Sequence, residues 1–449
     1  MKPSWRKYLH QNVPRYTSYP SALQFSDAVG RGDFVTALHA IQMYQPISLY
    51  VHIPFCKQLC WYCGCNMRVE NRYERAAQYV DVLLEEIKSV ARCLAGRGLL
   101  TQVHFGGGTP NYLKAQDLGR IVDAIEDGFG LTDATPIAIE LDPRMCGQNE
   151  MAKLVEAGIS RISLGVQDFT PAVQEAINRV QPYGMIEECV SAAREVGIDD
   201  ISFDLLLGLP KQTPDNFGET IRQTIALGPE RISLFGYAHM PSRLPHQRLI
   251  VEEDMPGRDS RAALFEEADK SFIDNGYMPI GFDHYARPHS AIALASMQGR
   301  LNRNFQGYTE DPSDTIIGVG ASAISSTPYL HVQNEKSVGA YMDAVGQTGM
   351  ASARGARACE WEGELGGWLK RLLCDRRANL SRYREIMPPN AEQFGAIQSA
   401  LELMQQDGIL TLDGDDLWVM EEAKPLLRTV AAVFDPMTKA GVRFAAPAI

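Results

Sequence analysis

Short apolar segments alternate with longer amphipathic segments along the first half of the chain. The short segments predict strands at 48–53, 103–105, 137–141, 161–165, 201–205 and 231–235. Between the first two, apolar residues recur at three- and four-residue steps from Tyr79 to Leu94, a spacing typical of a helix. The same spacing predicts further helices at 150–157, 170–178, 185–196 and 215–226.

This alternation predicts an α/β fold with a parallel sheet and right-handed crossovers. Six strand–helix units would form an incomplete barrel of the (β/α)6 type, and a flavodoxin-like open sheet is the alternative. A further strand is expected at 278–282. The segment 240–258 is rich in proline and charge, so we expect it to be a surface excursion.

The pattern changes toward both ends of the chain. Residues 1–45 carry many aromatic side chains and predict a packed N-terminal arm, while 46–350 would hold the barrel and its extension. In 351–449 a helix face from Phe394 to Met404 leads into a hairpin at Asp413-Gly414. We expect this part to be a mainly helical, winged-helix-like accessory domain that packs as a lid rather than binding DNA.

The composition is typical of a soluble globular protein. Hydrophobic residues make up 45% of the 449 residues, and the formal net charge of −12 counts against nucleic-acid or anionic-membrane partners. No apolar run reaches the roughly 18 residues of a membrane span. The first residues lead into no apolar signal segment, so we expect a cytoplasmic protein, and a monomer.

Four of the nine cysteines fall in the short stretch directly after the first predicted strand. Cys56, Cys60 and Cys63 form a CxxxCxxC motif, and three close thiolates can bind three irons of a cubane 4Fe–4S cluster. A structural zinc site would need other spacings, and the odd cysteine count does not suggest a disulfide framework. Cys65 could be a fourth ligand, although its spacing favours a pocket-lining thiol beside the cluster.

Other polar or flexible residues stand where predicted strands end. Gly106-Gly107-Gly108-Thr109 follows a strand and would let backbone groups approach a ligand, although such a turn is also a common structural feature. Glu140 ends a strand and would face the barrel mouth, or be a solvated acid. Asp204 lies in an apolar strand, where an unpaired carboxylate costs several kcal/mol, so we expect a ligand or an arginine partner there.

The cysteine motif after the first strand of such a barrel is the signature of the radical S-adenosylmethionine (SAM) superfamily, and the chain resembles the oxygen-independent coproporphyrinogen III oxidases. The resemblance covers about residues 12 to 350 and is carried by six segments. These are Arg15-Tyr16-Thr17-Ser18-Tyr19-Pro20, the block from Tyr50 to Cys65, Gly106 to Pro110, Gly165 to Phe169, Gly208 to Thr213 and Asn304 to Thr309.

The resemblance implies a cofactor site in which Cys56, Cys60 and Cys63 bind the 4Fe–4S cluster and an open iron binds SAM. Two SAM molecules are implied. Residues matching contacts to the first are Tyr50, Tyr62 beside the adenine, Gly107, Gly108, Thr109, Glu140 at the ribose and Ile324. Those matching contacts to the second are Gln167, Arg179, Asp204 and Ala238. Cys65 and Tyr62 are the residues expected to act in catalysis.

The resemblance also implies an activity in haem and porphyrin biosynthesis. A 5′-deoxyadenosyl radical would take hydrogen from the carbon β to the carboxylate on two propionates of coproporphyrinogen III. Loss of carbon dioxide then gives the vinyl groups of protoporphyrinogen IX, with an unidentified electron donor and acceptor. Arg15, Arg287 and Arg303 are candidates to pair with propionates, because arginine recognises carboxylates bidentately.

Two alternatives stay open at this point, a haem chaperone and a radical SAM enzyme that modifies a tetrapyrrole in another way. Cys65 and the tyrosine-rich arm favour the oxidase, since chaperone relatives typically lack both. The segment 359–368 departs from the family pattern. It contains an adjacent glycine pair and lacks a cation that the family pattern has there. Each glycine weakens a helix by roughly 1 kcal/mol relative to alanine. This departure counts against substrate fit or catalytic activity more than against the fold or the cofactor.

Overall fold

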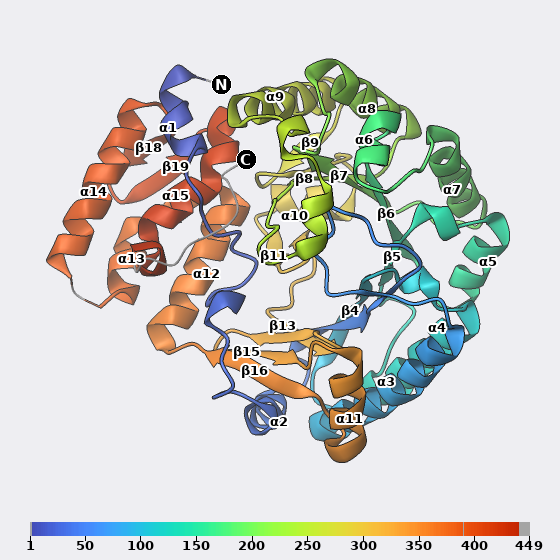
Figure 1. Cartoon of the computed structure of the whole chain (residues 1–449). Helices are drawn as coiled ribbons and strands as arrows, with labels where there is room; N and C mark the ends of the chain where they lie inside the picture. Colours follow the sequence, from blue (N-terminus) through green and yellow to red (C-terminus); the bar gives the residue numbers. More distant parts are fainter. Residues whose placement is uncertain (1, 389, 440–449) are drawn as a thin grey trace.

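The computed structural model describes residues 2–388 and 390–439 (Figure 1). Its centre is a sheet of twelve strands, of which seven were predicted: β9 (Met278–Ile280), expected at 278–282, and the six strands of the strand–helix units. These six lie side by side in chain order, each parallel to the next, and confirm the predicted parallel sheet. They are β1 (Pro46–Ile53), β4 (Leu99–Gly107), β5 (Ile137–Leu141), β6 (Arg161–Gln167), β7 (Ile201–Leu207) and β8 (Arg231–Gly236).

The strand order decides between the two predicted architectures. A flavodoxin-like sheet would place its second strand outside the first, whereas here the order never reverses. The incomplete barrel is therefore confirmed. On one side the sheet continues through β13 (Thr315–Val319), parallel to β1, and then through antiparallel neighbours. The remaining strands at the two sides are β14 (Ile324–Thr327), β15 (Leu330–Asn334), β16 (Ser352–Arg357), β10 (His284–Ala286) and β9 (Met278–Ile280).

Helices connect the parallel strands and lie around the outside of the sheet (Figure 1). The predicted helices are confirmed, while a helix over 115–129 was missed although its apolar residues recur at helical steps and are buried. The helices of this part are α3 (Tyr73–Leu94), α4 (Ala115–Phe129), α5 (Gln148–Glu156), α6 (Pro171–Ala176), α7 (Tyr183–Glu195), α8 (Pro214–Leu227), α9 (Arg258–Asp274), α10 (Ala291–Met297) and α11 (Val338–Thr348).

The start of the chain packs against its C-terminal part, as Figure 1 shows for α1 (Arg6–Leu9). Trp5 is only 2% exposed, and its indole nitrogen donates to the carbonyl of Asp407 at 2.9 Å. The Tyr8 hydroxyl donates to the carboxylate of the same Asp407 at 2.7 Å. Buried aromatic side chains thus fix this segment in place.

The C-terminal part combines helices with a three-stranded sheet of order β17-β19-β18. Its elements are α12 (Glu360–Asp375), β17 (Arg377–Asn379), α13 (Leu380–Ile386), α14 (Ala391–Gln406), β18 (Leu410–Asp413), β19 (Asp416–Val419), α15 (Leu427–Phe434) and α16 (Pro436–Lys439). The hairpin at Asp413-Gly414 is present. The division at residues 45 and 350 stays a prediction, and β16 belongs to the large sheet although it follows residue 350.

Helix α12 forms across the segment that departs from the family pattern. A Cβ atom on Gly363 would lie 2.5 Å from Cε1 of Tyr329, and one on Gly366 would lie 3.3 Å from Cβ of Tyr19. The glycines therefore permit close approach by the β14–β15 hairpin and by the N-terminal arm. Burial of Leu365 and Leu369 offsets the weaker helix propensity.

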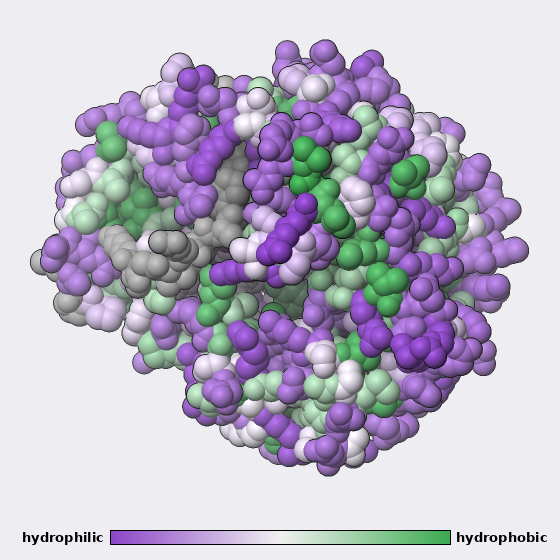
Figure 2. Space-filling model, in the orientation of Figure 1, coloured by the Kyte–Doolittle hydropathy of each residue, from purple (hydrophilic) through white to green (hydrophobic). Residues whose placement is uncertain are grey.

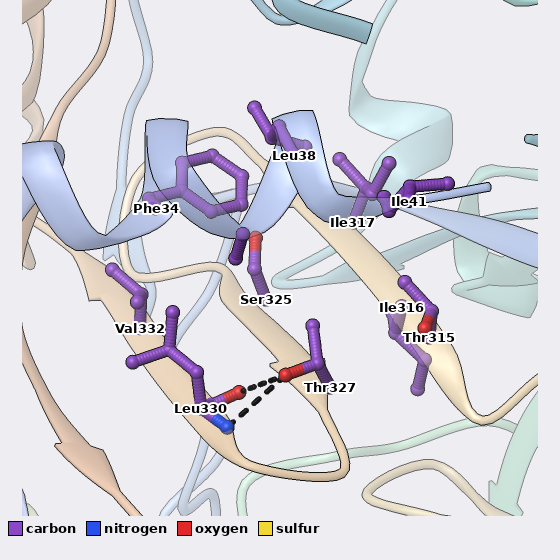
Figure 3. A pocket seen from close by; sticks show the side chains of 11 residues that line it. Phe34, Leu38, Ile41, Thr315, Ile316, Ile317, Ser325, Thr327, Leu330 and Val332 are labelled. Atoms are coloured by element: carbon purple, nitrogen blue, oxygen red, sulfur yellow. Dashed lines mark hydrogen bonds between the residues drawn. The ribbon is translucent and has the colours of Figure 1, made fainter. Parts of the chain in front are cut away.

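Figure 3 shows an apolar cavity between α2 (Arg31–Ala40) and the strands β13 to β15. Phe34, Leu38 and Val332 line it, and its volume is about 10 Å³. A space of that size holds about one water molecule, so it is a packing gap rather than a ligand site.

The face of the molecule in Figure 2 is mostly hydrophilic, with small hydrophobic patches near its middle. Within the described residues, no helix is long and apolar enough to span a membrane.

Candidate active site

The carboxyl ends of the parallel strands meet at one edge of the sheet, and the cysteine loop follows the first of them. After β1 the chain forms β2 (Phe55–Cys56), which pairs with β3 (Arg68–Val69) on the far side of the loop. Cys56 and Cys60 are buried, Cys63 is half-buried and Cys65 is exposed. The loop thus presents its sulfur atoms at the mouth of the barrel, where ligands bind in such folds.

Neighbouring segments hold this loop through its backbone. The amide of Trp61 donates to the carbonyl of Ile177 at 2.9 Å, and the side-chain amide of Gln247 donates to the carbonyl of Tyr62 at 2.9 Å. Nε2 of His246 lies 2.7 Å from the carbonyl oxygen of Cys63. The segment 240–258 is therefore not merely a surface excursion, because Gln247 is 1% exposed and the segment covers the cysteine loop.

Polar side chains surround the motif sulfurs. Sγ of Cys56 lies 3.2 Å from Oγ1 of Thr109. Sγ of Cys60 lies 3.5 Å from Nη1 of Arg179 and 3.7 Å from Nη2 of Arg144. Two guanidinium cations at one sulfur stabilise a thiolate, the form in which cysteine binds iron.

The thiols differ in their proton affinity. Burial raises the pKa of Cys56 to about 12. A hydrogen bond from the Cys65 thiol lowers the pKa of Cys63 to about 7, and the same bond raises the pKa of Cys65 well above its usual range. Cys63 and Cys65 are therefore not equivalent, because the Cys63 sulfur accepts the hydrogen bond that the Cys65 thiol donates.

The donor set fits an iron–sulfur cluster better than a single ion. Among residues 2–388 and 390–439, no three His, Cys, Asp or Glu side chains converge closely enough to hold one metal ion. In a cubane each cysteine binds a different iron, so the ligands need not converge on one point. Three cysteines on one loop, with cations at a sulfur, supply what such a cluster requires.

The glycine turn after β4 packs directly on the segment that leads into the cysteine loop. Gly107 has φ +117°, and a Cβ atom there would lie 2.6 Å from Cε1 of His52. A Cβ atom on Gly108 would lie 2.9 Å from the carbonyl oxygen of Phe55. Glycine is therefore required here for close packing of the protein backbone and ring, whatever ligand the turn also contacts.

Glu140, at the end of β5, is held by two donors. Nε2 of His104 lies 3.1 Å from its Oε1, and the amide of Gly107 donates to its Oε2 at 3.2 Å. Burial favours the neutral acid, but His104, the amide of Gly107 and His52 together outweigh it and lower the pKa of Glu140. An ionised carboxylate at the barrel mouth can accept hydrogen bonds from a diol.

Tyr50 forms the wall beside this carboxylate. Its ring stacks on His104 with centroids 6.0 Å apart and meets Phe305 edge-on at 4.9 Å. Ala323, which precedes Ile324 at the start of β14, belongs to the same small apolar cluster. Tyr50 and Ile324, which are far apart in the sequence, thus lie at one side of the mouth.

The residues expected at a second SAM come from neighbouring strands and loops: Gln167 ends β6, Arg179 follows α6, Asp204 lies in the middle of β7 and Ala238 follows β8. Nη2 of Arg179 donates to the carbonyl of Gly165 at 2.9 Å, and a Cβ atom on Gly165 would lie 2.8 Å from Nε2 of Gln167. Gly165 is also the register partner of Asp204. Ala238 follows β8, and its carbonyl accepts from Gln247 at 3.4 Å.

Two charged residues of this group have shifted pKa values. Burial alone would lower the pKa of Arg179, but Tyr62, Asp142 and Cys60 raise it. Burial raises the pKa of Asp204, which accepts from the Ser163 hydroxyl at 2.9 Å. The partners of Asp204 are thus the hydroxyls of Ser163 and Ser233 rather than an arginine, and the ligand expected there as the alternative stays a prediction.

Sequence reasoning missed several residues of the site and misplaced one. Asp142 and Arg144 form an ion pair at 2.7 Å beside Cys60, and only the fold brings them there. His104, on β4, belongs to no motif of the sequence, and it contacts Glu140. Arg287 lies over the Tyr277 ring, 4.1 Å from its centroid, and therefore stands outside the site.

The fold and this cysteine loop define a radical SAM protein, and residues 50–224 match the family model described as the radical SAM superfamily. The oxygen-independent coproporphyrinogen III oxidase of Bradyrhizobium diazoefficiens is 37% identical over 431 residues, which is 95% of each chain. The Escherichia coli protein of that name is 37% identical over 425 residues, 94% of this chain and 92% of its own.

A solved structure agrees with these relatives. Coproporphyrinogen III oxidase (HemN) from Escherichia coli, described as a radical SAM enzyme, matches with a TM-score of 0.88 at 36% identity, covering 95% of this chain and all of its own. The chain belongs to the family of oxygen-independent coproporphyrinogen III oxidases.

Proposed function

We propose that this chain catalyses the anaerobic oxidative decarboxylation of coproporphyrinogen III to protoporphyrinogen IX with SAM and a 4Fe–4S cluster. The observation that carries the proposal is 37% identity to a coproporphyrinogen III oxidase over 95% of both chains. That span includes the cysteine loop, the carboxyl ends of all six strands and the C-terminal helices, so the similarity is not confined to a cofactor-binding module.

Cys56, Cys60 and Cys63 would hold the cluster. When bound, the cluster and SAM supply a 5′-deoxyadenosyl radical that can take hydrogen from an unactivated carbon. The protein's own residues would position the cluster and SAM and shield them from water. Arg179 stabilises negative charge at the Cys60 sulfur, 3.5 Å away. Gln247 and His246 close the segment 240–258 over the loop and exclude water from it.

The polar residues at the mouth would bind the two SAM molecules. Glu140, kept ionised by His104, would accept hydrogen bonds from a ribose diol. The other proposed contacts to the first molecule are Tyr50, Tyr62, Gly107, Gly108, Thr109 and Ile324. Those to the second are Gln167, Arg179, Asp204 and Ala238. Cys65 is exposed beside Cys63 and would face the substrate together with Tyr62.

The proposal also covers the electron partners of the reaction, the cellular compartment and the oligomeric state of the chain. The electron donor and the final electron acceptor are partners still to be identified. We place the chain in the cytoplasm and expect it to act as a monomer, so its sedimentation mass should equal that of one chain, 49.7 kDa.

Anaerobic turnover tests the proposal. The reconstituted chain, a chemical reductant, SAM and coproporphyrinogen III should give a divinyl product, detected by chromatography after oxidation to the porphyrin. Cys56→Ala should abolish it, and Cys359→Ala, which changes an exposed thiol on α12, should not. Tight haem binding without vinyl product would contradict the proposal and favour the chaperone, and a methylated or ring-opened product would favour another tetrapyrrole-modifying enzyme.

A further inference from the structure

Four arginines from distant parts of the chain gather beside the carboxyl end of β8. Nη2 of the first donates to the carbonyl of Gly236 at 3.0 Å, and Nη2 of the second donates to the carbonyl of Tyr237 at 3.0 Å. The third lies on β11 (Asn302–Asn304) and the fourth on α15. In chain order the members of this arginine cluster are Arg15, Arg261, Arg303 and Arg428.

The cluster is crowded with positive charge. Burial, together with the charges of Arg15 and Arg258, lowers the pKa of Arg261 to about 10. The surrounding protein lowers the pKa of Arg15 by desolvation, and the charge of Arg303 lowers it too, against the opposing charge of Asp283. Like charges this close repel each other, so the cluster favours an anion between them.

One carboxylate of the protein lies within the cluster. Burial would raise the pKa of Asp283, but the charges of His284, Arg303 and Arg428 lower it. Arg15 also feels the Asp283 charge. Arg15 and Arg303 therefore both interact with the Asp283 carboxylate.

Guanidinium donors in the cluster are left unsatisfied. Arg303 is 8% exposed, and its guanidinium lies over the rings of Phe282 and Tyr308, with centroid distances of 4.7 and 4.6 Å. Its Nε and Nη1, and Nε of Arg261, are buried and have no hydrogen-bond partner in the part of the chain that the structure describes. A buried donor without a partner is costly, and a carboxylate is the group that pairs best with arginine.

The cluster lies near the cysteine loop, because Tyr237, whose carbonyl accepts from Arg261, belongs to the same apolar cluster as Trp61 and Tyr62 of that loop. Gly236 and Tyr237 directly precede Ala238, a proposed SAM contact. The charge of His284 acts to lower the pKa of both Asp283, in the cluster, and Asp204, a second proposed SAM contact. The cysteine motif follows β1, and the arginines gather at the carboxyl end of β8. A ligand that spans the mouth would place its acidic groups on the arginine side.

We propose that the arginine cluster is a subsite for propionate carboxylates of the substrate, which the N-terminal segment and the C-terminal part complete by contributing Arg15 and Arg428. This inference rests on the proposed function, because it takes the tetrapyrrole acid as the ligand. It replaces Arg287 with Arg261 and Arg428 among the propionate-binding residues.

Binding of coproporphyrin III to the full chain tests the subsite. This porphyrin is the air-stable oxidised form with the same four propionates, and its fluorescence reports binding. Arg15→Gln and Arg261→Gln should each raise the Kd about tenfold or more, because each removes a charge-assisted pair. Arg300→Gln should leave the Kd unchanged, since Arg300 is exposed and bonded to Gln298. The tetramethyl ester of the porphyrin should bind weakly and equally to all four proteins.

Each remaining outcome has one meaning. Wild-type binding with unchanged Kd values in both cluster variants would overturn the subsite. Loss of reductant-driven SAM cleavage in Arg15→Gln without substrate would also overturn it, by placing Arg15 at the cofactor. A wild-type chain that neither binds coproporphyrin III nor forms vinyl product would contradict the proposed function itself. Equal melting temperatures of the wild type and the variants exclude misfolding. Arg15→Lys keeps the positive charge but loses the bidentate guanidinium, so its Kd for coproporphyrin III should lie between those of the wild type and Arg15→Gln.

Discussion

Nη1 of Arg179 lies 3.5 Å from Sγ of Cys60. The same nitrogen lies 3.5 Å from Oδ2 of Asp142, which holds the guanidinium in place. A cation next to a ligand sulfur stabilises negative charge on the cluster and favours its reduced form. Arg179 should therefore raise the reduction potential of the bound cluster, whether or not it also contacts SAM.

Replacing this arginine should shift the potential. We expect Arg179→Gln to lower the reduction potential by about 60 mV or more, since loss of a charged hydrogen bond costs about 1.5 kcal/mol or more and 59 mV corresponds to about 1.4 kcal/mol for one electron. A redox titration followed by electron paramagnetic resonance measures it. Arg300→Gln is the control, and an unchanged or higher potential in Arg179→Gln would show that the guanidinium does not act on the cluster.

The three motif cysteines should differ from the fourth in iron binding. Anaerobic reconstitution should give about four irons per chain in the wild type and in Cys65→Ala, and far fewer in Cys56→Ala, Cys60→Ala and Cys63→Ala. Iron and sulfide analysis measures this, with Cys93→Ala as the control on α3. Loss of iron in Cys65→Ala would instead make that residue a ligand.

The prediction of the fold succeeded for elements that can be recognised from the residues of one continuous segment. β1 and β4 to β8 could be located because each contains a short apolar segment, and in β5, β6 and β7 buried side chains alternate with half-buried ones. The antiparallel extension from β14 to β16 is short and mixed in composition, and its pairing depends on residues brought together by the rest of the sheet. The glycines of α12 were interpreted as weakness because their partners, Tyr19 and Tyr329, come from distant segments.

The prediction of the candidate site had the same limit. Spacing alone located Cys56, Cys60 and Cys63, which share one loop. Asp142, which pairs with Arg179, could not be recognised as a site residue from the sequence, because a carboxylate after a strand is common. Arg428 comes from the last helices, where no motif directs attention to the mouth, and only the folded chain brings it beside Arg303.

The glycines of α12 give a matched pair of substitutions. Gly367→Ala should stabilise the chain by about 1 kcal/mol, because alanine favours helix and nothing lies within 4 Å of the added methyl group. Gly363→Ala should lose that gain and destabilise the chain, because its Cβ would lie 2.5 Å from the Tyr329 ring and 2.9 Å from the Pro328 carbonyl oxygen. Denaturant unfolding of both variants measures the difference, and equal stabilisation would show that the close packing is unimportant.

Glu86 should make stability depend on pH. Its carboxylate is buried and accepts from Tyr341 and Asn334 at 2.8 Å, and burial raises its pKa from 4.5 to about 7. The folded chain therefore binds more protons than the unfolded chain between those values, and stability falls as pH rises through this range.

Glu86→Gln should remove this dependence. Relative to the variant, the wild type should lose about 3 kcal/mol of unfolding free energy between pH 4.5 and 7, the equivalent of the pKa shift. Denaturant unfolding across this pH range measures it. Glu85→Gln, on the exposed side of the same helix, should keep the wild-type slope. Parallel slopes for wild type and Glu86→Gln would contradict the assigned pKa.

Transfer of deuterium tests the central claim most directly. Coproporphyrinogen III labelled at the β-carbons of its propionates is incubated anaerobically with the reconstituted chain, reductant and unlabelled SAM. We predict one deuterium in the recovered 5′-deoxyadenosine, together with the divinyl product. Unlabelled 5′-deoxyadenosine, or labelled substrate returned intact after SAM cleavage, would contradict the claim that this site decarboxylates coproporphyrinogen III by hydrogen abstraction.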